Sequence, residues 1–142
     1  MTKSTAIIVR DDGFSAEDWT GRLVPLPGGV AANADGVDVA SGDDVAALAA
    51  HLNRLRMIRI DFPSFADGRG FTLARRLRQM GYTGRLRARG HVLADQYAMA
   101  RRAGFDEVEI SGALAARQPE AQWLARSVWR AHDYQARLRR AV

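Results

Sequence analysis

Apolar residues recur at helical spacing in some stretches of the chain and cluster in short runs in others, which predicts alternating helices and strands. The predicted helices span residues 43–55, 70–80, 92–103 and 119–142. The predicted strands between them span residues 57–62, 85–89 and 105–110. Asp43 is the expected N-cap of the first helix, and Gly81 and Gly104 are the expected C-caps of the next two. Strands separated by helices are typical of right-handed parallel crossovers.

The first 40 residues show a weaker pattern. Short strands are predicted at residues 6–10, 22–26 and 37–40, separated by turns rich in glycine, proline and aspartate. We expect these strands to form a small, irregular antiparallel β appendage. The length of 142 residues fits a single domain, with residues 1–40 as the appendage and residues 41–142 as a core of βα repeats.

Each predicted strand from residue 57 onward has one apolar and one charged face. The apolar faces carry Ile58, Ile60, Phe62, Leu86, Ala88, Val108 and Ile110. The opposite faces carry Arg59, Asp61, Arg85, Arg87, Arg89, Glu107 and Glu109. We therefore predict an α/β fold, a parallel βα-repeat sheet with helices mainly on one face, like part of a βα-barrel. A flavodoxin-like doubly wound sheet is the alternative.

Composition narrows the chemistry. The chain has no cysteine, which excludes a thiol nucleophile and any centre held by cysteine thiolates. No cofactor fingerprint is present, and we predict no cofactor. His91 and Asp95 lie one helical turn apart, but this pair does not define a metal site, and we predict none. The start of the chain lacks a secretory apolar segment and no apolar run is long enough to span a membrane, so we expect a cytoplasmic protein without membrane contact.

Charge is distributed unevenly. Residues 1–53 hold three basic and eight acidic side chains, a net charge of −5, whereas residues 54–142 hold eighteen basic and eight acidic ones, a net charge of +10. The basic part is either a solvated surface or a binding region for an anion or a partner. Nucleic acid is not expected, because aromatic residues do not alternate with the arginines. The charged strand face is likewise either an ion-pair lattice or a site, open or covered by another subunit, where surplus arginines hold an anion.

Ligands of parallel α/β folds bind at the carboxyl ends of the strands. The segments that reach this edge are residues 61–70, 89–95 and 110–112. In the first segment, Gly68 and Gly70 allow close backbone approach and the helix start offers free N–H groups to an oxyanion, although Asp67 can simply cap the helix. The candidate anion- or partner-binding residues are Asp61, Phe65, Asp67, Gly68, Arg69, Gly70, Arg87, Arg89, His91, Asp95 and Gln96.

Several short sequence motifs, together with their spacing, resemble those of a bacterial family catalogued as domain of unknown function 934. They are Phe62-Pro63-x-Phe65-x-Asp67-Gly68-Arg69-Gly70, Leu77-Arg78, Gly81-Tyr82-x-Gly84, Leu86-Arg87-Ala88, Gly90, Asp95-Gln96, Arg102-x-Gly104-Phe105 and, near the end, Tyr134-Gln135. The chain departs from the family pattern at Arg85, His91 and Ala103. Genes of this family typically lie beside those for assimilatory sulfite reduction, so the resemblance implies a role in that pathway.

Two functional hypotheses follow. The first is an accessory protein of sulfite reduction that binds the sulfite reductase hemoprotein, its electron donor or a small oxyanion. The second is a small-anion enzyme or oxidoreductase of the same pathway, with Asp61 or Asp67 as acid/base and arginines such as Arg69 as clamps. Arg69 is then expected near Arg89 or His91. A homo-oligomer is compatible with either hypothesis.

Overall fold

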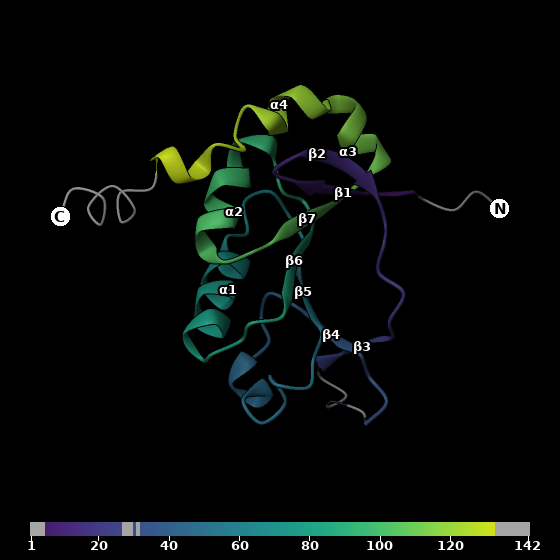
Figure 1. Cartoon of the computed structure of the whole chain (residues 1–142), viewed down its shortest axis with the longest axis vertical. Coiled ribbons are helices and arrows are strands. Elements are labelled where there is room, and N and C mark those ends of the chain that lie inside the picture. Colours follow the sequence, from purple (N-terminus) through teal and green to yellow (C-terminus); the bar gives the residue numbers. More distant parts are fainter. Residues whose placement is uncertain (1–4, 27–29, 31, 133–142) are drawn as a thin grey trace.

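The computed structural model describes residues 5–26, 30 and 32–132. Seven strands form one mixed sheet in the order β2-β1-β7-β6-β5-β4-β3 (Figure 1). The strands are β1 (Ala6–Arg10), β2 (Gly13–Ala16), β3 (Leu23–Pro25), β4 (Gly36–Val39), β5 (Met57–Phe62), β6 (Arg85–Gly90) and β7 (Glu107–Ser111). The α-helices are α1 (Arg69–Gln79), α2 (Tyr97–Ala103), α3 (Gly112–Arg117) and α4 (Glu120–Leu124), and short 3-10 helices are η2 (Val45–Leu48), η3 (Ala94–Gln96) and η4 (Trp129–His132).

The parallel strands β3 to β7 follow one another in the sheet in chain order. Right-handed crossovers between successive neighbours place the connecting helices on the same side, and Figure 1 shows α1 and α2 together on one side of the sheet. The predicted α/β fold with helices mainly on one face is confirmed. The doubly wound alternative is wrong, because it requires a reversal of strand order.

The predicted appendage in residues 1–40 is instead split between the two edges of the main sheet. β1 pairs antiparallel with β7 and with β2, a four-residue strand that the sequence pattern did not indicate. β3 and β4 pair parallel at the other edge. Residues 17–22 connect β2 to β3 and cross the side of the sheet opposite α1 and α2 (Figure 1). We call these residues the strap.

Three predicted helices are shorter than expected. The helix predicted at 92–103 is the 3-10 turn η3 followed by α2, which begins only at Tyr97. Residues 43–55 contain only the 3-10 helix η2 and successive turns, because the N–H groups bond three residues back. Asp44, not Asp43, is its N-cap and accepts from Ala46 N at 3.0 Å. The apolar spacing of this segment suits 3-10 turns as well, and Val45 and Leu48 are buried as expected.

The predicted helix at 119–142 is also broken. α3 begins before it, after Ser111, whose hydroxyl accepts from Leu114 N. Pro119 then starts α4, which ends at Leu124. Residues 133–142, with the Tyr134-Gln135 pair of the family pattern, lie outside the described residues. Over the described part of the chain, no helix has the length and apolarity needed to cross a bilayer.

The apolar strand faces and the inward faces of the helices form one continuous core. Phe62 of β5 stacks against Phe71 of α1 at 5.0 Å between ring centroids and against Phe105 at 5.8 Å. These contacts fix α1 on the sheet and end β5 at the carboxyl edge. The core therefore holds the edge loops in place.

Candidate functional site

The structure confirms the charged strand face that the alternation of apolar and charged residues predicts. The register pairs Arg87 of β6 with Glu107 of β7 and Arg89 with Glu109. Arg87 has 0% exposed side chain and donates to Glu107 at 2.5 Å and to Glu109 at 2.7 Å. Its remaining Nη2 donates to Glu17 of the strap at 2.8 Å. Arg87 is thus enclosed by carboxylates and cannot reach a dissolved anion or a partner.

The strap neutralises the arginines that the strands present. Asp18 pairs with Arg10 at 3.0 Å and also contacts Arg85. In the described part of the chain, the face and strap together hold the arginines 10, 22, 59, 85, 87 and 89 and the carboxylates of Glu17, Asp18, Asp38, Asp61, Glu107 and Glu109. The acidic side chains of the face and strap are therefore as numerous as the basic ones. Of the two alternatives for this face, the ion-pair lattice therefore describes most of it, and there is no surplus of arginines among these residues.

The pKa values of the strap carboxyls reflect this pairing. Burial alone would raise the pKa of Glu17, but hydrogen bonds from Arg87 and from the Trp19 backbone N–H outweigh it and lower the pKa. A hydrogen bond from Arg85 is the main reason that the pKa of Asp18 is lowered. Both carboxylates are therefore ionised at neutral pH and hold the strap on the sheet.

Three small cavities lie in a row along the carboxyl edge of the parallel strands. The acidic cavity, of about 200 Å³, has Asp38, Asp43, Asp61, Arg59 and Arg89 as its charged lining. The middle cavity, of about 180 Å³, is lined by Arg89, Gly90, Glu109 and Ser111 among others. The basic cavity, of about 190 Å³, is lined by Phe65, Gly90, His91, Ser111, Leu114 and Arg117. Neighbouring cavities share lining residues, so the three cavities adjoin one another along this edge of the sheet.

Asp61 and Arg89 face each other across β5 and β6 in the acidic cavity. Among the described residues, no group bonds to the Asp61 carboxylate. The Arg89 side chain is 48% exposed, and its ion pair with Glu109 is long, at 3.6 Å. The side chains of Asp61 and Arg89 can therefore still bond to a ligand, whereas the Arg87 side chain is fully occupied by its ion pairs.

His91 and Arg117 supply the basic groups of the basic cavity. His91 Nδ1 lies 3.2 Å from the carbonyl oxygen of Phe62. Because a carbonyl only accepts, Nδ1 carries the proton and Nε2 is the ring nitrogen left for a ligand. Phe65 packs edge-on against the imidazole at 4.9 Å between ring centroids. Arg117 is exposed and has no ion pair with any described residue.

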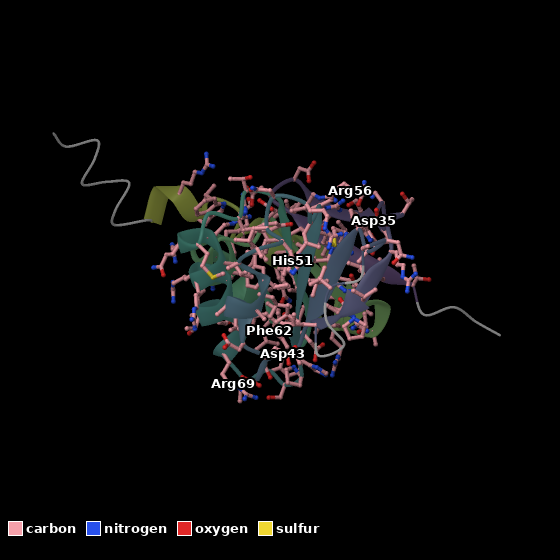
Figure 2. The ribbon with its side chains drawn as sticks, turned by 90° about the horizontal axis from the view of Figure 1, so that it is seen from below. Asp35, Asp43, His51, Arg56, Phe62 and Arg69 are labelled. Carbon is pink, nitrogen blue, oxygen red and sulfur yellow. The ribbon has the colours of Figure 1, made fainter. Side chains whose placement is uncertain are left out.

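Asp67 and Arg69, at the start of α1, do not line these cavities. Arg69 pairs with Asp67 at 2.8 Å and donates to Ser41 at 2.9 Å, and these contacts occupy its guanidinium. Figure 2 shows Arg69 at the margin of the molecule, beyond Phe62. The hydrogen bond from Arg69 lowers the pKa of Asp67 far below its ordinary range, so Asp67 is a poor proton carrier at neutral pH.

The glycines beside Arg69 have separate structural roles. Gly68 is the N-cap of α1, and Asp67 accepts from Arg69 N at 3.1 Å, which satisfies one free N–H of the helix start. A Cβ at Gly70 would lie 2.5 Å from the Phe62 ring. Close packing of α1 on β5, not approach of an anion, explains the glycine at position 70.

Asp95 and Gln96 are adjacent in sequence but act in different places. Gln96 donates to the Phe65 carbonyl at 3.3 Å and accepts from Leu93 N at 2.9 Å, so it positions the loop that carries Phe65. Asp95 instead pairs with Arg126 at 3.0 Å, away from the edge cavities. The candidate site therefore retains Asp61, Phe65, Arg89 and His91, with Gln96 as a positioning residue.

Sequence reasoning missed Arg117. The apolar pattern predicts no helix between residues 110 and 119, although Ser111, a good N-cap, precedes an alanine- and leucine-rich stretch. That signal, together with Pro119, indicates a short helix whose last turn carries Arg117.

The fold and its edge define a class: an α/β protein with a mixed sheet whose helices lie mainly on one face, a self-neutralised charged face and a row of small cavities with charged lining residues at the carboxyl edge. A family model described as bacterial protein of unknown function (DUF934) matches residues 36–141. The chain belongs to this family. A comparison with curated proteins found no match.

Part of the family pattern has a structural role in this chain. Arg78 donates to the carbonyl oxygens of Tyr82, Gly84 and Gly104, which ties the end of α1 to the turns before β6 and β7. The Tyr82 hydroxyl donates to the carbonyls of Leu55 and Arg85. The family motifs that contain Arg78 and Tyr82 therefore stabilise the fold, whereas Phe65 and Gly90 line the basic cavity.

Proposed function

We propose that the chain is an accessory protein of assimilatory sulfite reduction, which binds a small oxyanion or an acidic side chain of a partner in the basic cavity. The single observation that carries this site is Arg117, a cation without an ion pair to any described residue, which lines the same cavity as His91. Charge-assisted hydrogen bonds from an arginine guanidinium are a usual means of holding an oxyanion, and the unprotonated Nε2 of His91 can accept a hydrogen bond from a protonated oxygen of the ligand.

The family supports the pathway. Genes of the DUF934 family typically lie beside those for sulfite reduction, and the family model matches most of this chain. The proposed partner is the sulfite reductase hemoprotein or its electron donor. The protein is placed in the cytoplasm with that system.

Cavity size favours binding of a small group. The three edge cavities measure about 200, 180 and 190 Å³. Sites for drug-sized ligands and organic cofactors span about 300–1,000 Å³. A sulfur oxyanion or a single carboxylate side chain fits the smaller volume.

Titration with sulfite and with sulfate, followed by amide NMR shifts, tests the anion site. Arg117→Ala should weaken binding about tenfold to a hundredfold, because a charge-assisted hydrogen bond contributes about 1.5–3 kcal/mol. Arg75→Ala is the matched control, since Arg75 is exposed on α1 and outside the cavities. Equal affinities of the two variants would exclude the basic cavity as the anion site.

A pull-down from sulfate-grown cells tests the partner. The full chain and the Arg75→Ala variant should retain the hemoprotein or its electron donor, and Arg117→Ala should lose it if an acidic side chain of the partner occupies the cavity. If neither protein is retained by the full chain, the accessory role is wrong.

A small-anion enzyme is the second candidate, favoured by the unpaired Asp61 beside Arg89. Asp61 would act as the acid/base and Arg89 as the anion clamp. Sulfur oxyanions are incubated with the protein and the electron donor of the sulfite reductase hemoprotein, and ion chromatography should then show turnover that Asp61→Asn abolishes. Identical time courses with and without the protein would exclude this role.

A further inference from the structure

A second surface lies at the junction of α2, α4 and η4, apart from the carboxyl edge. It encloses about 330 Å³, more than any edge cavity. Ala98, Met99, Ala125, Val128 and Trp129 form its apolar lining, and Asp95, Arg102 and Arg126 complete it. We call it the α2–η4 groove.

Exposed apolar side chains gather at this groove. Within the described residues, the large hydrophobic side chains with substantial exposure are Met99 at 45%, Leu124 at 39% and Val128 at 58%. Met99 and Val128 line the groove, and Leu124 precedes the lining residue Ala125. Single exposed apolar residues are normal on a protein surface, but a cluster over one groove marks an interaction site.

Trp129 is held in place as a firm wall of the groove. Two guanidinium groups stand over its ring, that of Arg101 at 4.7 Å from guanidinium carbon to ring centroid and that of Arg130 at 5.0 Å. Its indole N–H donates to Asp11 at 3.2 Å. An aromatic side chain that is already immobilised loses little entropy when a partner packs on it, which is typical of interface hot spots.

The charge around the groove is positive. Arg102 and Arg126 line it, Arg130 stands on Trp129 beside it, and Asp95 is the only acidic residue in the lining. The ion pair between Arg126 and Asp95 is solvent-exposed, with 51% and 81% of the side chains accessible. Such a pair contributes little and exchanges readily for another carboxylate.

We propose that the α2–η4 groove is a docking site for an acidic amphipathic helix of a partner protein. Apolar side chains of that helix enter between Met99, Val128 and Trp129, and its carboxylates pair with Arg102, Arg126 and Arg130. A groove between helices that is lined by both apolar and basic side chains fits this mode of peptide recognition. Met99 adds a side chain that adapts to different apolar partners.

A synthetic probe tests the proposal with the full chain. A fluorescein-labelled peptide with leucine at helical spacing and glutamate elsewhere is compared by anisotropy with a peptide of the same composition in scrambled order. The patterned peptide should bind at least tenfold more tightly, and Arg126→Ala and Val128→Ser should each weaken it about tenfold, while Arg75→Ala should not. Equal binding of both peptides, or no binding, would overturn the proposal.

The absence of cysteine allows the occupant to be identified directly. A Val128→Cys variant labelled with a photo-crosslinker has a single attachment point in the groove. Crosslinks to the patterned peptide support the proposal. Crosslinks in the presence of the peptide that instead join a second copy or residues 133–142 of the same chain overturn it. The peptide should still bind Arg117→Ala, so failure of this surface and failure of the anion site are distinguishable.

Discussion

Arg87 shows how a residue that looks like an anion clamp becomes part of the scaffold. Removing its charge and its counter-charges from water is costly, and the ion pairs with Glu107, Glu109 and Glu17 offset that cost without a large net gain. The energetic consequence is asymmetric. Loss of the cation leaves buried carboxylates without a partner, which costs far more than the intact lattice contributes.

Arg87→Met should therefore lower the free energy of unfolding by about 3–5 kcal/mol, the usual result of breaking a buried ion pair. Arg89→Met is the matched control, because Arg89 is 48% exposed and its ion pair is long. The control should change stability by less than about 1 kcal/mol. Urea denaturation of both variants measures the difference, and a similar loss in the two would show that the lattice around Arg87 is not tightly coupled.

At the same scale, the sequence predicts which strand residues share a face but not what covers them. Period-two alternation places Arg85 and Arg87 with Glu107 correctly. Glu17 and Asp18 follow a short strand and have no periodicity, so nothing local marks them as the counter-charges of Arg85 and Arg87. Long-range partners of this kind follow from topology, which the sequence pattern does not specify.

Among the elements, α1 and β5 show why some predictions succeed. The apolar stripe of α1 and the alternation of β5 each agree with their local environment, and both elements form where expected. Residues 43–55 fail because spacings of three and four residues do not distinguish α-helix from 3-10 turns. The helix predicted from residue 119 does begin after Pro119, as α4, but it ends at Leu124, and a separate helix, α3, begins earlier, after the cap at Ser111.

The contact between α1 and β5 depends on Gly70. Gly70→Ala should destabilise the protein by about 1–3 kcal/mol, the usual cost of overpacking, although alanine is normally the better helix former. The new Cβ would lie 2.5 Å from the Phe62 ring, so either helix or ring must shift. Gly68→Ala is the control, because the nearest side-chain atom there is 3.8 Å away. Thermal melting of the two variants decides, and a Gly70→Ala protein as stable as the control would contradict the close packing.

At the scale of the whole molecule, the sequence predicts that the candidate site lies at the carboxyl edge of the sheet, but it does not predict which side chains there remain free to bind a ligand. Chain order of strands and helices indicates that the segments after β5, β6 and β7 meet at one edge, which brings Asp61, Arg89 and His91 into adjoining cavities. Side-chain pairing within each loop decides which residues remain available. Asp67 and Arg69 neutralise each other, whereas Arg117 remains unpaired among the described residues.

The strap joins the two edges of the sheet, so its attachment affects the stability of the whole fold (Figure 1). Glu17 and Asp18 attach it through arginines, and the pKa of each carboxyl is lowered from its ordinary value of 4.5 or 3.8. A carboxyl with a lowered folded-state pKa stabilises the fold above its ordinary pKa, and this contribution is lost as pH falls through the folded-state pKa.

The melting temperature of the protein should therefore fall as pH is lowered from about 5 toward 2, and Glu17→Gln should make that fall shallower, because the amide has no proton to gain. Glu17→Gln should also melt at a lower temperature than the unmodified chain at pH 7, where the bonds from Arg87 are at full strength. Asp12→Asn is the control, since it removes the same charge from an exposed residue outside the strap. Melting curves recorded by circular dichroism across this pH range separate the two variants. If Glu17→Gln follows the pH dependence of the unmodified chain as closely as Asp12→Asn does, the strap is held by its backbone and not by its carboxylates.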